Sequence, residues 1–463
     1  MSKHLKYALL SVVFILGYAS LSFELIILRQ LINFVGSNTL ITSLVITFIL
    51  LFMTIGYYFG SVIKFKTNQI RHKIQKMILS LNFIFILASS YYIMQTYFVI
   101  MYKLSITNFL PSVTIFSALF LALPSVFMGF ITSVIGRIIH RYDVNYTGRF
   151  MAIDTFGSVA GSIATTLIFM PFLSVSGTII ILILLTSAAL IVVSNKKFIV
   201  QNIFLAITFI CMAFILNNEK IMVGTNHLVK DDAISRLEII PDEIIDNEVQ
   251  SLMMKINGSY SSKVSLVDNN SFGYVKFIND NFIYNLAEDK IHDILILGAG
   301  GFTIGLEDNR NNYTFLDIEP SLQQISEEKF LKRKLGKNKK FIVQDAYLFM
   351  INNTNKYDVI ILDIFSSLNN VPLNFVTTNF FTMVKDHLKP NGVMVANIIT
   401  SPNFANKFSK RVDNTLRHVF PHYLNRQVIQ HNLELSNVEY VYYNYPTDNT
   451  IYTLDKSSAM YGQ

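Results

Sequence analysis

Three glycines and an aspartate in the second half of the chain are spaced as in a nucleoside-binding site. Gly298, Gly300 and Gly301 follow an apolar run at residues 294–297. Glycine lets the backbone turn sharply and lie close to a ligand. About twenty residues later Asp317 ends a second apolar run, and an acid there can accept hydrogen bonds from both hydroxyls of a ribose. The alternative is a tight turn without a ligand, but the combination predicts a nucleoside-binding α/β domain.

Two further aspartates, Asp345 and Asp363, also lie at or just beyond the ends of expected strands. In parallel sheets, ligands bind beyond the carboxyl ends of the strands. Each acid has a structural alternative. Asp317 could cap a helix that starts near residue 320, Asp345 could cap one that starts at Ala346, and Asp363 could be a turn residue.

The elements that must position these residues alternate from residue 293 onward. We expect strands at 293–297, 313–317, 340–343, 358–362 and 392–398, with helices at about 320–334 and 376–388. Such alternation predicts an α/β doubly wound, mostly parallel sheet covered on both faces. Residues 234–266 alternate in polarity and predict a β-rich lead-in, with Asn257-Gly258 as a hairpin turn.

The first half of the chain has the composition of a membrane protein. The 463 residues are 52% hydrophobic, and the apolar residues concentrate before residue 218. Each run reaches the roughly 20 residues that cross a hydrocarbon core, and buried soluble helices do not explain so many in succession. The first run lacks a cleavage site and is not a removed signal. The expected spans are 7–28, 38–63, 76–100, 112–136, 150–172, 175–194 and 198–217.

Charge also separates the halves. Before residue 218 lie 14 of the 38 basic residues but only 3 of the 31 acidic ones. The high pI therefore belongs to membrane loops and indicates no nucleic-acid surface. The basic loops alternate along the chain, which predicts a cytoplasmic N-terminus. Seven crossings would put the C-terminal domain outside, whereas a cytoplasmic nucleoside supply would put it inside. Both topologies stay open.

Three ionisable residues, Glu24, Arg29 and Asp154, lie in or beside the spans. Charges at bilayer depth usually pair or line a polar cavity, and Arg29 could instead reach the interface. Gly157 and Gly161 form a small-xxx-small face that allows close helix contact. Structural pairing and a substrate or ion pathway both remain open. The single cysteine, Cys211, excludes an intramolecular disulfide and a cysteine-based metal site, and no metal is expected.

As a set, residues 235–397 resemble the spermidine synthase (polyamine aminopropyltransferase) family, in its membrane-fused branch. The order and spacing of the motifs carry the resemblance. The similar segments are 235–239, 255–258, 294–301, 315–320, 344–346, 357–365, 371–372, 377–381 and 388–393, with 17–29, 123–129 and 154–161 in the membrane half.

The resemblance implies a Rossmann-like fold of the S-adenosylmethionine-methyltransferase type and a role for each site residue. The turn at 298–301 would face the amino-acid-derived part of decarboxylated S-adenosylmethionine. Asp317 would bind its ribose, and Asp345 with Ala346 its adenine. Asp363 would act as the base, or orient the attacking amine.

The acceptor side departs from the family pattern. The usual carboxylates are absent, Tyr274 is kept, and Lys276 adds a positive charge. The loss of these acids argues against putrescine as acceptor. The residues found at the acceptor-side positions are Ser261, Asn270, Ser271, Tyr274, Lys276 and Ser366.

The preferred interpretation is a membrane-bound transferase that uses decarboxylated S-adenosylmethionine, or S-adenosylmethionine, as donor and an amine other than a simple diamine as acceptor. A methyltransferase and a non-catalytic nucleoside-binding transport or sensor protein are the alternatives. The expected partners are these small molecules and the lipid bilayer of a bacterial plasma membrane, and a homo-oligomer is allowed. The expected parts are a membrane domain at 1–217, a β-rich part at 218–290, a Rossmann-like domain at 291–445 and a tail at 446–463.

Overall fold

The structure is a computed structural model. It describes residues 3–36, 39–63, 67–106, 108–142, 146–194, 196–268, 270–364, 373–429 and 435–447. The chain divides into two compact units. The first comprises Met1–Ile239 with Lys255–Ser259, and the second comprises Ile240–Met254 with Tyr260–Gln463.

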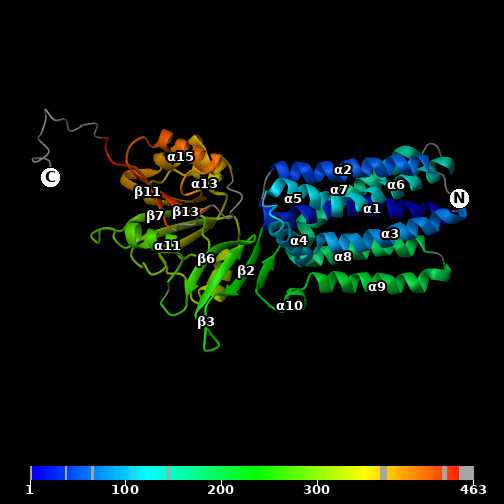
Figure 1. Ribbon diagram of the computed structural model, residues 1–463, viewed down its shortest axis with the longest axis horizontal. Coiled ribbons are helices and arrows are strands. Elements are labelled where there is room, and N and C mark those ends of the chain that lie inside the picture. Colours follow the sequence, from blue (N-terminus) through cyan, green and yellow to red (C-terminus); the bar gives the residue numbers. More distant parts are fainter. Residues whose placement is uncertain are drawn as a thin grey trace, which may run out of the picture. The chain divides into compact units, whose positions relative to one another are not determined.

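The first unit is a bundle of long apolar helices (Figure 1). Among the described residues, five helices are long and apolar enough to cross a membrane, or six if the pair bent by 65° at Ser90 counts as one span. The helices are α1 (Lys3–Val35), α2 (Thr39–Val62), α3 (Thr67–Ser89), α4 (Tyr91–Lys103), α5 (Phe109–Phe116), α6 (Ala122–Tyr142), α7 (Thr147–Ile163), α8 (Met170–Val193), α9 (Ile199–Leu216) and α10 (Glu219–Met222).

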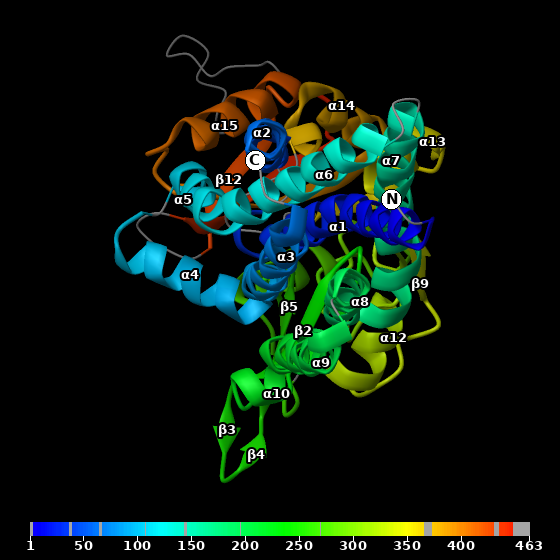
Figure 2. The ribbon, with the colours of Figure 1, turned by 90° about the vertical axis from the view of Figure 1, so that its right-hand side faces the viewer.

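Helix α1 lies in the interior of the bundle, in contact with α3, α6, α7 and α8 (Figure 2). Its contact with α7 is close because glycines face it. A Cβ at Gly157 or Gly161 would overlap the backbone carbonyl of Phe14 or Tyr18. The small-xxx-small contact face predicted at these glycines is therefore confirmed, and it explains how the two helices approach so closely.

The chain reverses direction within residues 147–193, at Ser174. This residue has φ 65° and ψ 173°, which are not helical values. Both ends of the segment lie at the N-terminal end of α1. The Lys6 ammonium nitrogen lies 3.6 Å from the centre of the ring of Tyr146, the residue just before α7. Val193, which ends α8, lines a cavity of about 230 Å³ together with Leu5. One straight helix of 47 residues would measure about 70 Å and would hold its two ends far apart.

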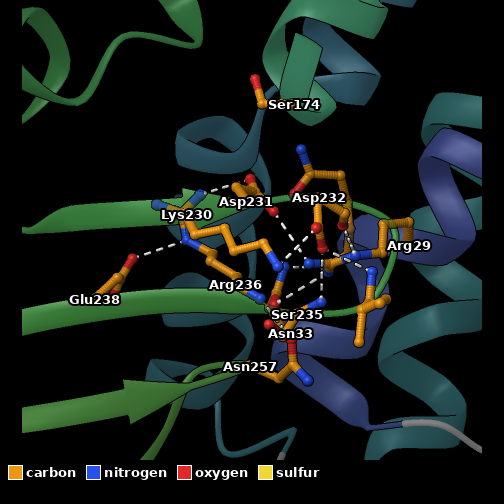
Figure 3. Close-up of polar contacts among 12 residues, drawn as sticks. Arg29, Asn33, Ser174, Lys230, Asp231, Asp232, Ser235, Arg236, Glu238 and Asn257 are labelled. Carbon is orange, nitrogen blue, oxygen red and sulfur yellow. Dashed lines mark hydrogen bonds and ion pairs between the residues drawn. The ribbon is translucent and has the colours of Figure 1, made fainter. Parts of the chain in front are cut away.

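At the opposite end of the bundle, a strand hairpin is tied to α1 by ion pairs (Figure 3). Strands β1 (Leu228–Asp231) and β2 (Arg236–Pro241) pair antiparallel. The Asp231 carboxylate accepts from Arg29 at 3.1 Å and from Arg236 at 2.9 Å, and all three side chains are buried. Arg29 also donates to the Asp232 carbonyl at 2.6 Å. Arg29 is thus paired, and the alternative that it reaches the interface alone is wrong.

The turn at Asn257-Gly258 belongs to the same unit. Its φ values are 48° and 80°, as a type I′ hairpin turn requires. The Asn257 side chain accepts from the Arg236 backbone N–H at 2.9 Å, and a Cβ at Gly258 would overlap the Asn33 carbonyl. The predicted hairpin turn is confirmed, and glycine is required at its second position.

The second unit is built on a seven-stranded sheet of order β12-β13-β11-β10-β7-β8-β9. Strands β11, β10, β7, β8 and β9 run parallel, whereas β13 and β12 are antiparallel. The predicted mostly parallel sheet is confirmed. The strands are β7 (Asp293–Leu297), β8 (Asn312–Asp317), β9 (Lys339–Val343), β10 (Tyr357–Leu362), β11 (Leu388–Thr400), β12 (Leu424–Val428) and β13 (Ser436–Tyr443).

The remaining elements of the C-terminal half lie before and between these strands in the sequence. The helix expected at 320–334 is shorter, because its α-helical part ends at Ile325 and a π-helical turn follows to Phe330. The two antiparallel strands and the last helix were not predicted. The other elements are β3 (Ile244–Ile245), β4 (Glu248–Val249), β5 (Ser251–Ile256), β6 (Ser259–Ser265), α11 (Gly273–Ile278), α12 (Leu322–Ile325), α13 (Ala346–Asn352), α14 (Thr378–Asp386) and α15 (Lys407–Val419).

We predict that Arg29→Ala destabilises the helical unit. The substitution removes one of the two guanidinium partners of the buried Asp231 carboxylate. Loss of one partner from a buried ion pair typically lowers the free energy of unfolding by roughly 3–5 kcal/mol. The midpoint of thermal unfolding of the full-length protein in detergent should fall by several degrees. Arg333→Ala is the matched control, since its ion pair with Glu307 is exposed and should contribute about 1 kcal/mol or less. Equal midpoints for the two variants would contradict the structural role of Arg29.

Candidate functional site

The glycine turn follows β7 directly and is packed too tightly for other residues. Gly298 has φ 92° and Gly300 φ 48°, in the left-handed region that favours glycine. A Cβ at Gly298 would overlap the backbone carbonyl of Asp363, and one at Gly300 would meet the Ser262 hydroxyl at 2.8 Å. That hydroxyl accepts from the Gly301 N–H at 2.7 Å. The turn therefore has no side chain that would keep a ligand away from its backbone, and it lies directly against Asp363.

Asp317 ends β8 beside this turn and does not cap a helix. Its two carboxylate oxygens accept from the Ala299 N–H at 3.2 Å and the Glu319 N–H at 3.1 Å. The following helix begins at Leu322 with Ser321 before it, so the capping alternative for Asp317 is wrong. Burial raises the pKa of Asp317, while these N–H groups lower it. Each oxygen keeps a free lone pair, so the carboxylate can still accept from a diol.

Asp345 lies two residues beyond the end of β9 and caps α13. Its side chain accepts from the Leu348 N–H at 2.9 Å, and Ala346 begins the helix and is buried. The capping alternative is thus present here. One oxygen satisfies the cap, and the other can still accept from a ligand, so capping and ligand binding are compatible.

Asp363 directly follows β10 and is held by two side chains. Tyr274 of α11 donates to one carboxylate oxygen at 3.0 Å, and Asn397 of β11 donates to the other at 2.9 Å. The Asn397 carbonyl oxygen accepts in turn from Asn437 of β13 at 2.9 Å. Both oxygens of Asp363 therefore have fixed positions at the edge of the sheet.

The electrostatics of Asp363 suit proton transfer. Burial raises its pKa to about 7, against the smaller lowering by the Asn397 and Tyr274 hydrogen bonds. A general base is most effective when its pKa lies near the working pH. Burial together with the Asp363 carboxylate raises the pKa of Tyr274 well above its ordinary value, so Tyr274 keeps its proton and remains a donor.

A fourth acid, Glu439 of β13, was not found from the sequence. It is fully buried, and neither carboxylate oxygen has a hydrogen-bond partner within the described residues. It pairs across the sheet with Asn397, the residue that holds Asp363. Burial and the Asp363 carboxylate raise its pKa well above the ordinary value. Its sequence signal was an acid inside the aromatic and β-branched strand Ser436–Tyr443.

The structure separates the predicted acceptor-side residues. Tyr274 is buried against Asp363, whereas Asn270 and Lys276 are exposed. The Lys276 charge acts on Asp268, whose pKa it helps to lower after the Ser265 and backbone hydrogen bonds. Ser366 lies outside the described residues.

This arrangement has relatives among known proteins. The Spermine/spermidine synthase domain family matches residues 289–430, which include the glycine turn and all three predicted acids. Residues 289–430 are therefore a spermidine synthase-like domain. The synthase-like domain accordingly carries the Rossmann-like, methyltransferase-type fold.

Individual relatives are distant. A "Probable polyamine aminopropyl transferase" from Bifidobacterium longum is 27% identical over 136 residues, covering 28% of this chain and 30% of its own length. A "Polyamine aminopropyltransferase" from Sulfolobus acidocaldarius is 28% identical over 160 residues, covering 30% of this chain and 52% of its own. The chain thus spans about half or less of these relatives. A probable spermidine synthase of known structure from Corynebacterium glutamicum has 22% identity and a TM-score of 0.40, over 49% of this chain and 82% of its own.

We predict that Asp317→Ala weakens binding of an adenosyl sulfonium donor at least about 100-fold. Two ribose hydroxyls would lose a charged acceptor, and each such hydrogen bond contributes roughly 1.5–3 kcal/mol. Calorimetry with S-adenosylmethionine and its decarboxylated form, on the full-length protein in detergent, measures the effect. Exposed Glu328→Gln is the control, and both variants should unfold at the same temperature. Unchanged affinity of Asp317→Ala would contradict the ribose role.

Proposed function

We propose that this protein is a membrane-bound aminopropyltransferase that moves the aminopropyl group of decarboxylated S-adenosylmethionine to an amine. The observation that carries the proposal is the contact between the glycine turn and Asp363. The Gly298 backbone touches the Asp363 backbone, so a donor lying on the turn would have its reactive carbon close to a desolvated carboxylate. The site-residue roles implied by the family resemblance fit this arrangement.

The chemistry needs little beyond positioning and one proton transfer. The carbon next to a sulfonium is already activated, so the protein must deprotonate the amine and align it for in-line attack. Asp363, held by Tyr274 and Asn397, has a fixed orientation and a pKa near neutrality. Asp363 is half-buried with a raised pKa, and acids of this kind cluster at catalytic sites, which favours the enzyme over a binding or sensor protein.

Methyl transfer from S-adenosylmethionine is the second candidate. The glycine turn and Asp317 would bind either donor, since both carry the same adenosine. The two donors differ at the group attached to sulfur, so turnover with each donor separates the candidates.

We further propose that the bundle crosses the membrane seven times with its N-terminus inside. The two arms of the reversal at Ser174 match the expected spans 150–172 and 175–194. Arg71 and Arg141 line the same cavity as Leu5, so the basic loops gather at the N-terminal end of α1. Arg29 and the β1–β2 hairpin lie at the other end. By the positive-inside rule, the chain leaves the bundle on the outer side.

The test of the transferase is release of the thioether nucleoside by the full-length protein in detergent, with donor and a set of amines. We expect turnover with the decarboxylated donor, and Asp363→Asn should reduce kcat/KM about 100-fold or more. Because the ionised carboxylate acts and burial raises its pKa to about 7, kcat/KM should fall as the pH drops through 7. Exposed Asp386→Asn is the control. Turnover with S-adenosylmethionine alone would identify a methyltransferase, and binding without turnover a sensor.

The topology makes a separate prediction. Paired reporters that fluoresce only in the cytoplasm or mature only outside it, fused at Gln463, should report the outer side. A fusion after Ile63 should report the cytoplasm, since Arg137 binds the carbonyl of Ile63 at the basic end of the bundle. A cytoplasmic signal at Gln463 would show an even number of crossings and contradict the seven-span topology.

A further inference from the structure

Glu439 is an acid near the candidate site that the mechanism above does not use. Its side chain is completely buried on β13, and both of its carboxylate oxygens lack hydrogen-bond partners within the part of the chain that the structure describes. An ionised carboxylate in such a place is costly unless a cation pairs with it. This position therefore suits a positively charged ligand.

The sheet places Glu439 in line with the site. Leu297, Leu316, Leu362 and Ala396 are in register across β7, β8, β10 and β11. The next residues form a row, in which Gly298, Asp363 and Asn397 lie on successive strands. Asn397 then pairs with Glu439 on β13. Residues directly opposite in a sheet present their side chains on one face, so Glu439 lies on the same face as Asn397.

The row also sets the spacing of the two acids. Asp363 and Glu439 are separated by one strand, which corresponds to about 10 Å between their backbones. Asn397 lies between them and donates to Asp363. Asp363 also acts electrostatically on Glu439, so the two carboxyl groups are near each other without sharing a hydrogen bond. One ammonium group therefore fits each acid.

We infer that Glu439 pairs with the second, non-reacting nitrogen of the acceptor, so that the acceptor is a short amine with two positive charges. This rests on the proposed function. The family pattern has acids at the positions of Asn270 and Ser366, and this chain does not. Glu439 on β13 would supply the missing negative charge. The expectation against putrescine was based on the missing acids, and Glu439 removes that basis.

The transfer balances with these two acids. The reacting ammonium gives one proton to Asp363, and its lone pair forms the new nitrogen–carbon bond. The carbon–sulfur bond breaks, and its electron pair stays on sulfur, which becomes a neutral thioether. The second nitrogen keeps its proton throughout and stays paired with Glu439. Glu439 therefore acts as a specificity-determining residue and takes no proton.

The test compares putrescine with butylamine, which has the same four carbons but one charge. With the native protein, kcat/KM for putrescine should exceed that for butylamine at least about 30-fold. In Glu439→Gln the ratio should fall to about 3 or less, mainly through a higher KM for putrescine. Glu439→Asp should restore part of the preference. Donor affinity should be the same in all three proteins.

Asp413→Asn is the matched control and should leave the ratio unchanged, because Asp413 is a buried acid of α15 with one oxygen that has no partner among the described residues. If Glu439→Gln keeps the putrescine preference, Glu439 is only a protonated core residue and the inference is wrong. If the native protein uses both amines equally, the acceptor needs no second charge and the inference is also wrong, while the proposed function stands.

A binding measurement keeps the inference separate from turnover. With S-adenosylmethionine bound, calorimetry should show putrescine binding to the native protein at least about 10-fold more tightly than to Glu439→Gln, and butylamine binding equally to both. If no amine turns over but this difference is found, the proposed transfer fails and the diamine site stands. If putrescine binds both proteins equally, the site fails.

Discussion

The parallel register of β8, β7, β10 and β11 is the constraint on which the candidate site depends. Leu316, Leu297, Leu362 and Ala396 are in register across these strands. The next residue on each strand therefore lies at the same edge, which brings Asp317, Gly298, Asp363 and Asn397 together although they are distant in the chain. A register shift of one residue on β10 would turn the Asp363 side chain to the other face. The buried apolar strands that enforce this register, such as 294–297 and 359–362, are fully covered by neighbours.

Burial of acids at this edge is what makes the site chemically unusual. Asp363 is surrounded by neutral donors, Tyr274 and Asn397, and Glu439 has no donor at all among the described residues. Within those residues, neither acid receives a basic side chain that would lower its pKa. A protein tolerates such groups when a ligand supplies the missing charge or when a proton must be held near neutral pH. Both uses agree with amine chemistry.

The helical unit depends on a different interaction, the buried ion pairs at one end of α1. Arg29, Asp231 and Arg236 form a continuous ion-paired chain that joins α1 to the β1–β2 hairpin. Arg236 also lies over the Tyr91 ring at 3.5 Å, so its guanidinium is enclosed by aromatic and carboxylate partners. This network determines where the chain leaves the bundle. It is a structural device, and nothing in it calls for a transported substrate.

The sequence by itself determined the local features. Apolar length identified the long helices of the first unit, alternation identified the parallel sheet, and the positive-φ requirement identified the turns at Gly298 and Asn257-Gly258, because each of these follows from neighbouring residues. It also placed Asp317 and Asp363 at strand ends. Only the tertiary structure decided the partners of these side chains: that Asp345 caps α13, that Tyr274 and Asn397 donate to Asp363, and that Arg29 meets Asp231, some two hundred residues later. Glu439 could not be assigned from sequence, since its role comes from lateral pairing of β13 with β11, and strand order depends on contacts that the local pattern does not contain.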